Sequence, residues 1–178
     1  MTGIFDGFSW IRCEGKGSFL NSPAMKEFGD RRIAAGEKCL VVDLGECSGM
    51  DSTFMGTLAG MAARLSAQAE GSLHIADPGP RNRRSLEDLG LDFLMEIDPP
   101  LAIWRGNIDK VREGLKAPTI LPSTTPIERT KLVLEAHQEL ASQNEKNAQT
   151  FSQVVKTLED DLKVKQDKLK EAGSSGRD

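Results

Sequence analysis

The sequence predicts an α/β fold, in which helices pack on a mixed sheet, followed by a long C-terminal helix. Over residues 1–117, short apolar runs of strand length alternate with segments whose apolar residues recur every three or four positions. This alternation favours a parallel or mixed sheet with helical crossovers. A linker rich in Pro, Ser and Thr at 118–125 gives way to a charged, proline-free stretch. We therefore expect one domain, this linker, a long amphipathic helix at 126–172 able to form a coiled coil, and a flexible tail at 173–178.

The first predicted strand covers residues 8–14, where apolar and polar side chains alternate loosely before a glycine-rich break. This pattern is typical of a strand with one buried face. The next segment predicts a helix at 22–35, because Ser22 suits the N-cap, Pro23 suits the first helical position and Gly36 ends the apolar spacing.

A nearly continuous apolar run at 39–44 predicts a central strand that is buried on both faces. We expect a loop at 45–50 and then a helix that begins near Ser52. The residues with helical spacing in this helix are Phe54, Leu58, Met61, Ala62, Leu65 and Ala69.

The alternation continues to the end of the predicted domain. Short apolar runs predict strands at 73–76 and 93–97, with a helix at 81–89 between them that Gly90 ends. A last short helix is expected at 108–115.

The C-terminal segment carries the signals of one uninterrupted helix. Thr125-Pro126-Ile127-Glu128 matches a capping box, and a heptad pattern follows. The apolar a positions are Leu134, Ala141, Ala148, Val155, Leu162 and Leu169, whereas the d positions include the polar residues His137, Asn144 and Lys165. We expect the helix to pair with another helix or to lie along its own domain, with weak self-association or docking of another protein through 151–169. A partly frayed helix without a partner is the alternative.

Composition excludes several classes of function. The net charge is −4, which gives no overall attraction to nucleic acid. No stretch of about 18 apolar residues is present, so we expect neither membrane insertion nor export. The three cysteines are odd in number and widely spaced, as is typical of reduced thiols in a cytoplasmic protein.

The candidate functional site is the segment Met50-Asp51-Ser52-Thr53-Phe54, between the central strand and the following helix. The first N–H groups of a helix lack intrahelical partners and carry the positive end of the helix dipole, so a phosphate on Ser52 would meet an anion site. It would also repel a docked partner, and Asp51 would add to that repulsion. On spacing alone, however, a simple capped helix is the favoured explanation of Asp51 and Ser52.

The run Cys39-Leu40-Val41-Val42-Asp43-Leu44, followed by Met50-Asp51-Ser52-Thr53, resembles the central strand and phosphorylation site of STAS domains of the anti-sigma factor antagonist family. Gly15 and Leu89-Gly90-Leu91 fall where that family has a glycine and a Gly-Leu step, and the likeness covers residues 8–117.

This resemblance implies a STAS-type fold and a phosphorylation-controlled binding module. Ser52, in preference to Thr53, would be phosphorylated by an anti-sigma factor that acts as a serine kinase, and a phosphatase would remove the phosphate. The loop at 18–22 would lie beside the Ser52 loop. The implied partner-binding residues are Met50, Asp51, Ser52, Thr53, Phe54 and Asn21.

No residue pattern indicates catalysis, a cofactor or a metal. His74 and His137 are far apart in sequence and lack a Cys/His cluster around them, and no convincing nucleophile with a neighbouring base is apparent. The alternative function is a structural or scaffold STAS protein that is not phosphorylated and assembles through its C-terminal helix.

Overall fold

The computed structural model describes residues 1–117 and 124–174 of the chain. Five strands form one sheet, in the spatial order β1-β2-β3-β4-β5. β1 is antiparallel to β2, and the other neighbours are parallel, so the sheet is mixed as predicted. The strands are β1 (Thr2–Phe5), β2 (Phe8–Gly17), β3 (Cys39–Met50), β4 (Ser72–Ala76) and β5 (Glu96–Ile97).

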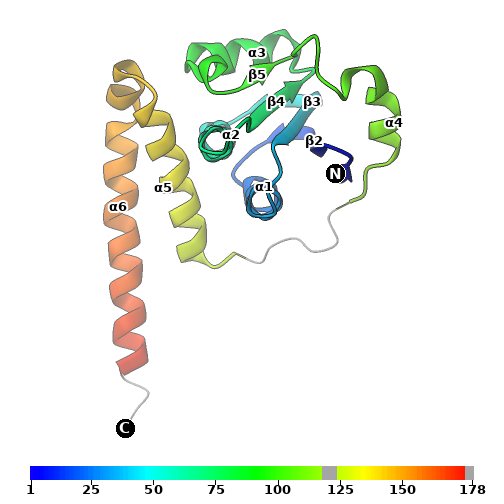
Figure 1. Cartoon of the computed structure of the whole chain (residues 1–178). Helices are drawn as coiled ribbons and strands as arrows, with labels where there is room; N and C mark the ends of the chain where they lie inside the picture. Colours follow the sequence, from blue (N-terminus) through cyan, green and yellow to red (C-terminus); the bar gives the residue numbers. More distant parts are fainter. Residues whose placement is uncertain (118–123, 175–178) are drawn as a thin grey trace.

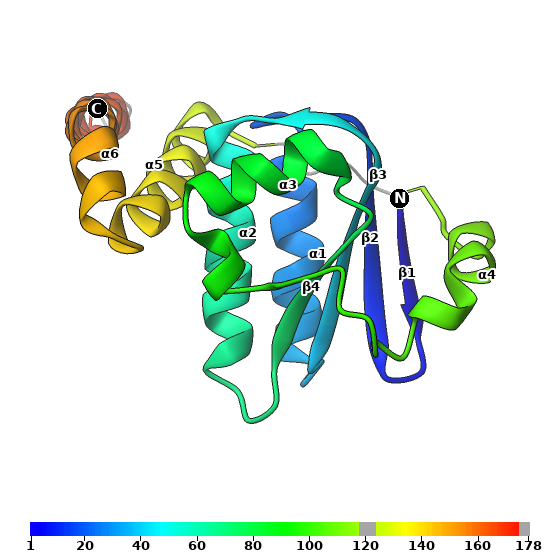
Figure 2. The same ribbon diagram turned by 90° about the horizontal axis from the view of Figure 1, so that it is seen from above.

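Six α-helices connect or follow these strands (Figure 1). They are α1 (Ser22–Ala34), α2 (Ser52–Ser66), α3 (Gly79–Asp88), α4 (Ile108–Glu113), α5 (Pro126–Ser142) and α6 (Glu145–Ser174). Parallel crossovers share one hand, so the sequential strand order places α1, α2 and α3 on the same face of the sheet. Figure 2 shows these three helices together, with α4 beyond the strands.

The sheet has a separate apolar core on each face, because successive side chains of a strand point to opposite sides. On β3, Leu40 and Val42 pack in the core under α1 and α2, whereas Val41 packs in the core that contains Trp10 and Trp104. All five side chains are fully buried or nearly so. The continuous apolar run at 39–44 is therefore a strand covered on both faces, as predicted.

Three strand predictions need correction. β1 was not predicted, and β3 extends through the segment 45–50 that was expected to be a loop. This extension pairs with β2 across two register shifts, which polar and glycine residues tolerate. The shifts interrupt the alternation of buried and exposed side chains by which a strand is recognised in a sequence. The strand expected at 93–97 is only Glu96–Ile97, since Leu91–Phe93 forms a 3-10 turn.

The single helix expected at 126–172 is also corrected, because the structure contains two helices. Asn144 interrupts the segment: its side-chain Oδ1 accepts a hydrogen bond from the amide of Asn147, 2.8 Å away, and so caps α6. Asn favours such a position over a helix interior. The capping box of Thr125 and Glu128 at the start of α5 is confirmed.

The two helices fold into a hairpin, which we call the α5–α6 hairpin. In Figure 1, α5 lies between α6 and the domain. The apolar positions of α5 pack on the domain, where Leu140 is fully buried and joins the core under α2. α6 continues past Gly173 to Ser174, while most of the predicted linker and tail, 118–123 and 175–178, lies outside the described residues.

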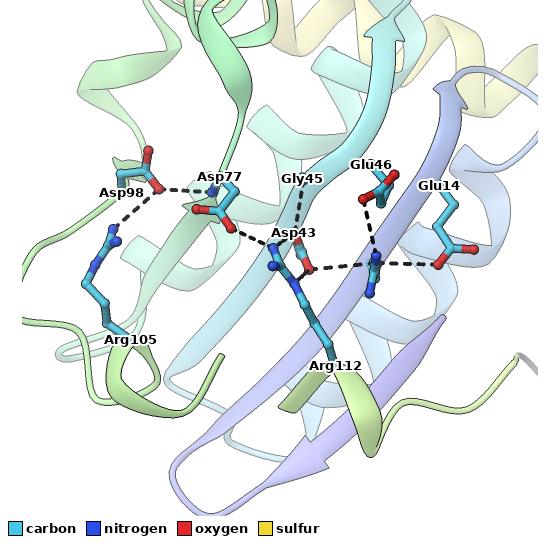
Figure 3. A network of polar contacts seen from close by, with 9 residues as sticks. Glu14, Asp43, Gly45, Glu46, Asp77, Asp98, Arg105 and Arg112 are labelled. Carbon is cyan, nitrogen blue, oxygen red and sulfur yellow. Dashed lines mark hydrogen bonds and ion pairs between the residues drawn. The ribbon is translucent and has the colours of Figure 1, made fainter. Parts of the chain in front are cut away.

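A buried ion network holds α4 against the sheet (Figure 3). Asp43 on β3 has no exposed surface and accepts two hydrogen bonds from Arg112 of α4, at 2.8 and 2.9 Å. Arg112 also contacts Asp77 at 2.6 Å, and the amide of Gly45 donates to Asp43. Hydrogen bonds to Asp43 raise the pKa of the Arg112 guanidinium above its usual value. The network compensates the cost of burying the Asp43 charge.

Candidate functional site

The site is built around Asp51, which joins two loops. Its Oδ1 accepts a hydrogen bond from the amide of Phe54 at 2.8 Å, so Asp51 is the N-cap of α2. Its Oδ2 accepts from the amide of Phe19 at 2.9 Å, and its own amide donates to the carbonyl of Gly17 at 2.9 Å. The loop that contains Phe19 therefore lies beside the start of α2, as the resemblance implied.

Ser52 is the first residue of α2, and its side chain does not cap the helix. Its Oγ lies 3.0 Å from Nε2 of His137 on α5. Nδ1 of His137 lies 2.7 Å from the carbonyl oxygen of Val133, which can only accept, so in the neutral imidazole Nδ1 carries the proton and Nε2 accepts from the Ser52 hydroxyl. Two segments that are 85 positions apart thus meet at the candidate phosphorylation site.

The other predicted site residues differ in their exposure. Met50 is half-buried, and Thr53 and Phe54 are buried, at 5% and 1% exposure. The Phe54 ring packs so closely on Gly17 that a Cβ there would lie 2.9 Å from it. Phe54, expected on the partner surface, is therefore a core residue. The Asn21 side chain is half-buried and bonds to Ser18 and Lys16 within its own loop.

Two residues of the loop at 18–22, which was predicted to share the partner surface but was represented among the site residues only by Asn21, give this loop an apolar tip. Phe19 is 44% exposed and Leu20 is 73% exposed. Two consecutive apolar residues in an exposed loop are typical of a contact surface, and this was the available signal. Phe19 also lines a hollow together with Val133 and Leu158 of the hairpin.

The contact between His137 and Ser52 was not predicted, because the heptad pattern indicated only that His137 occupies a d position of the C-terminal helix. The sequence contains no local signal for a contact across 85 positions. Its ring is 6% exposed and packs against Phe151 of α6, with ring centroids 5.5 Å apart. Both helices of the hairpin therefore position it.

Among residues 1–117 and 124–174, no group of three or more His, Cys, Asp or Glu is placed to hold a metal ion. Within the same described part of the chain, no helix combines the length and apolar character needed to cross a membrane.

Comparison with known families gives one match. A family model described as the STAS domain matches residues 2–102, which is more than half of the chain. The match ends before α5 begins, so the hairpin lies outside it. No curated protein matches the chain.

Two solved structures of one protein share the fold. The crystal structure of the Thermotoga maritima protein TM1081 has a TM-score of 0.52 at 18% identity and covers 63% of this chain and 93% of that one. The NMR structure of TM1081 gives 0.51 at 18% identity, with 62% and 86% covered. The unphosphorylated Bacillus anti-sigma factor antagonist SpoIIAA gives 0.49 at 20% identity, with 63% and 96% covered.

Proposed function

This chain belongs to the STAS domain family, and we propose that it is a phosphorylation-controlled binding module of the anti-sigma factor antagonist type. In this proposal it acts in the cytosol, needs no cofactor and catalyses no reaction of its own. Its partners are an anti-sigma factor that acts as a serine kinase and a phosphatase that removes the phosphate.

The position of Ser52 carries the proposal. Its hydroxyl stands at the first residue of α2 and is not used as the helix cap, because Asp51 supplies that cap. The first-turn amides of a helix favour an added anion. The exposed Phe19 and Leu20 lie beside it and offer apolar area to a docked protein.

Phosphorylation would act on this surface through charge. A phosphoserine carries about two negative charges at neutral pH, so its desolvation and repulsion oppose a docked partner. The carboxylate of Asp51 is fixed next to Ser52 and strengthens the repulsion of an acidic partner surface. The unphosphorylated form therefore binds, and the phosphorylated form releases.

Ser52 is favoured over Thr53 as the acceptor. The Thr53 side chain is buried inside the first turn, whereas Ser52 is half-buried. Phosphopeptide mass spectrometry on growing cells of the source organism tests this, and we expect phosphate on Ser52. Ser52→Ala should abolish it and keep the partner bound, while Thr53→Ala should change neither. Phosphate found only on Thr53, or normal release by the Ser52→Ala protein, contradicts the proposal.

A further inference from the structure

The α5 helix lies unusually close to α2 at one point, Gly56. A Cβ placed on Gly56 would lie 2.1 Å from the carbonyl oxygen of Ala136 and 2.8 Å from its Cα. Backbone atoms of α5 therefore occupy the space that any side chain at position 56 would need. This close approach places the next residue, His137, over Ser52.

The contact engages the hydroxyl of Ser52 completely. Its Oγ lies 3.0 Å from Nε2 of His137, and His137 is only 6% exposed. Phosphoryl transfer requires the attacking oxygen, the phosphorus and the leaving oxygen to lie roughly in line. A kinase cannot reach that line, and a phosphate cannot be accommodated on Oγ, while the imidazole remains 3.0 Å away.

The hairpin lies outside the matched family domain and packs on it through α5. Leu134, Ala136 and Leu140 are its buried apolar residues, and at the other end Asn144 and Asn147 donate to the carbonyl of Leu89, at 3.3 and 2.8 Å. The family model ends at residue 102, so the matched STAS domain does not include this hairpin. A segment that follows a domain and covers one of its helices can open locally while the sheet stays folded.

We propose that the face of α2 around Gly56 is a helix-binding surface that the α5–α6 hairpin fills in cis, and that Ser52 becomes accessible only when α5 leaves it. A protein partner that presents a helix with a small residue at the crossing point, as Ala136 does, competes for the same place. The kinase step rests on the function proposed above, but the masking itself does not.

Two glycines of α2 provide a matched pair of variants in the full-length protein. Gly56→Ala places a methyl group against the backbone of α5, whereas a Cβ at Gly60 meets only the side chains of Arg64 and Glu139, at 3.3 and 3.4 Å. Both changes raise helix propensity equally. Leu140→Ser weakens the same interface from the hairpin side and leaves the domain sequence unchanged.

Hydrogen exchange by mass spectrometry is the first readout. We expect Gly56→Ala and Leu140→Ser to accelerate exchange in α5 by about tenfold or more while β3 and β4 stay protected, and Gly60→Ala to change neither. If α5 stays protected in both variants, or if α5 and the strands lose protection together in both, the hairpin is an integral part of the core and the inference is wrong.

Access to position 52 is the second readout and needs no kinase. In a Ser52→Cys background, alkylation by iodoacetamide is followed at that position by peptide mass spectrometry. The thiol should react about tenfold faster or more with Gly56→Ala than with Gly60→Ala. Equal rates overturn the masking. The absence of phosphate on Ser52 in cells would instead refute the proposed switch and leave this result unchanged.

Discussion

At the scale of single residues, Asp51 stabilises a larger part of the site than a helix cap alone would. Its two carboxylate oxygens accept amides from Phe54 and Phe19, so one side chain fixes both the start of α2 and the loop beside it. Asp51→Ala removes both bonds. We expect it to lower the free energy of unfolding by about 2 kcal/mol, because an N-cap alone contributes about 1 kcal/mol.

Urea denaturation followed by circular dichroism measures this loss. Asp51→Asn is the matched control, because its one amide oxygen can retain the cap while its NH2 group cannot accept the amide of Phe19, so we expect it to lose only about 1 kcal/mol. A loss in Asp51→Ala no larger than that of Asp51→Asn would show that the cap contributes nothing.

His74 makes stability depend on pH. Burial lowers the pKa of His74, against a smaller opposing effect of Glu96, and its Nδ1 accepts the indole N–H of Trp104 at 3.0 Å. The unfolded chain binds this proton more readily, so the stabilisation is complete above the ordinary pKa of about 6.5 and is lost as the pH falls through the lowered value.

The test is the urea midpoint measured at about pH 7.5 and again at about pH 5.5, across the ordinary titration of histidine. His74→Gln keeps an acceptor for Trp104 and does not titrate, so its midpoint should fall less than that of the wild type. If the urea midpoints of the two proteins fall equally between the two pH values, His74 is not the source of the pH dependence.

At the scale of elements, sequence patterns predicted the segments whose structure depends on residues close to them in the sequence. The strand at 39–44 and the helix after Ser52 were found because apolar side chains repeat with the period of one element. The extension of β3 was missed because its pairing with Glu14, Lys16 and Gly17 of β2 is non-local and irregular. The start of α2 at Asp51–Ser52 was predicted, but its neighbour His137 was not.

The split at Asn144 has a similar cause. Its cap is local, but its bond to the carbonyl of Leu89 forms only when the hairpin is docked beside α3. The heptad pattern alone treats Asn144 as one polar position in a continuous helix. Tertiary contacts therefore decide whether this segment forms one helix or two, which helix propensity alone does not determine.

The docking of α4 includes a buried ion pair beside the apolar contact of Val111. Arg112→Met leaves the fully buried Asp43 without its main partner, and we expect a loss of about 3 kcal/mol in the free energy of unfolding. Adding Asp43→Asn to Arg112→Met should recover part of the lost free energy of unfolding, because Asp43 then no longer leaves an unpaired buried charge. Urea denaturation of both variants measures the difference. A double variant no more stable than Arg112→Met would contradict this explanation.

At the scale of the whole molecule, self-association is expected to involve α6 rather than α5. The apolar residues of α5 are used within the domain, whereas Val164 and Leu169 remain 52% and 61% exposed. We predict weak dimerisation through this end of α6, consistent with the scaffold alternative. Sedimentation velocity over a range of concentrations tests it against a Val164→Glu/Leu169→Glu variant. Identical, purely monomeric behaviour of both proteins at the highest concentration would refute it.

The covalent connection between α4 and α5 makes the hairpin a tethered competitor. A ligand on a short tether has an effective concentration of about millimolar, which falls as the tether lengthens. A partner that binds only the open molecule has an apparent dissociation constant equal to its intrinsic value divided by the open fraction, so about 1% opening weakens binding about 100-fold. In the proposed masking, the length of the segment between Glu113 and Pro126 thus contributes to the threshold concentration of the partner.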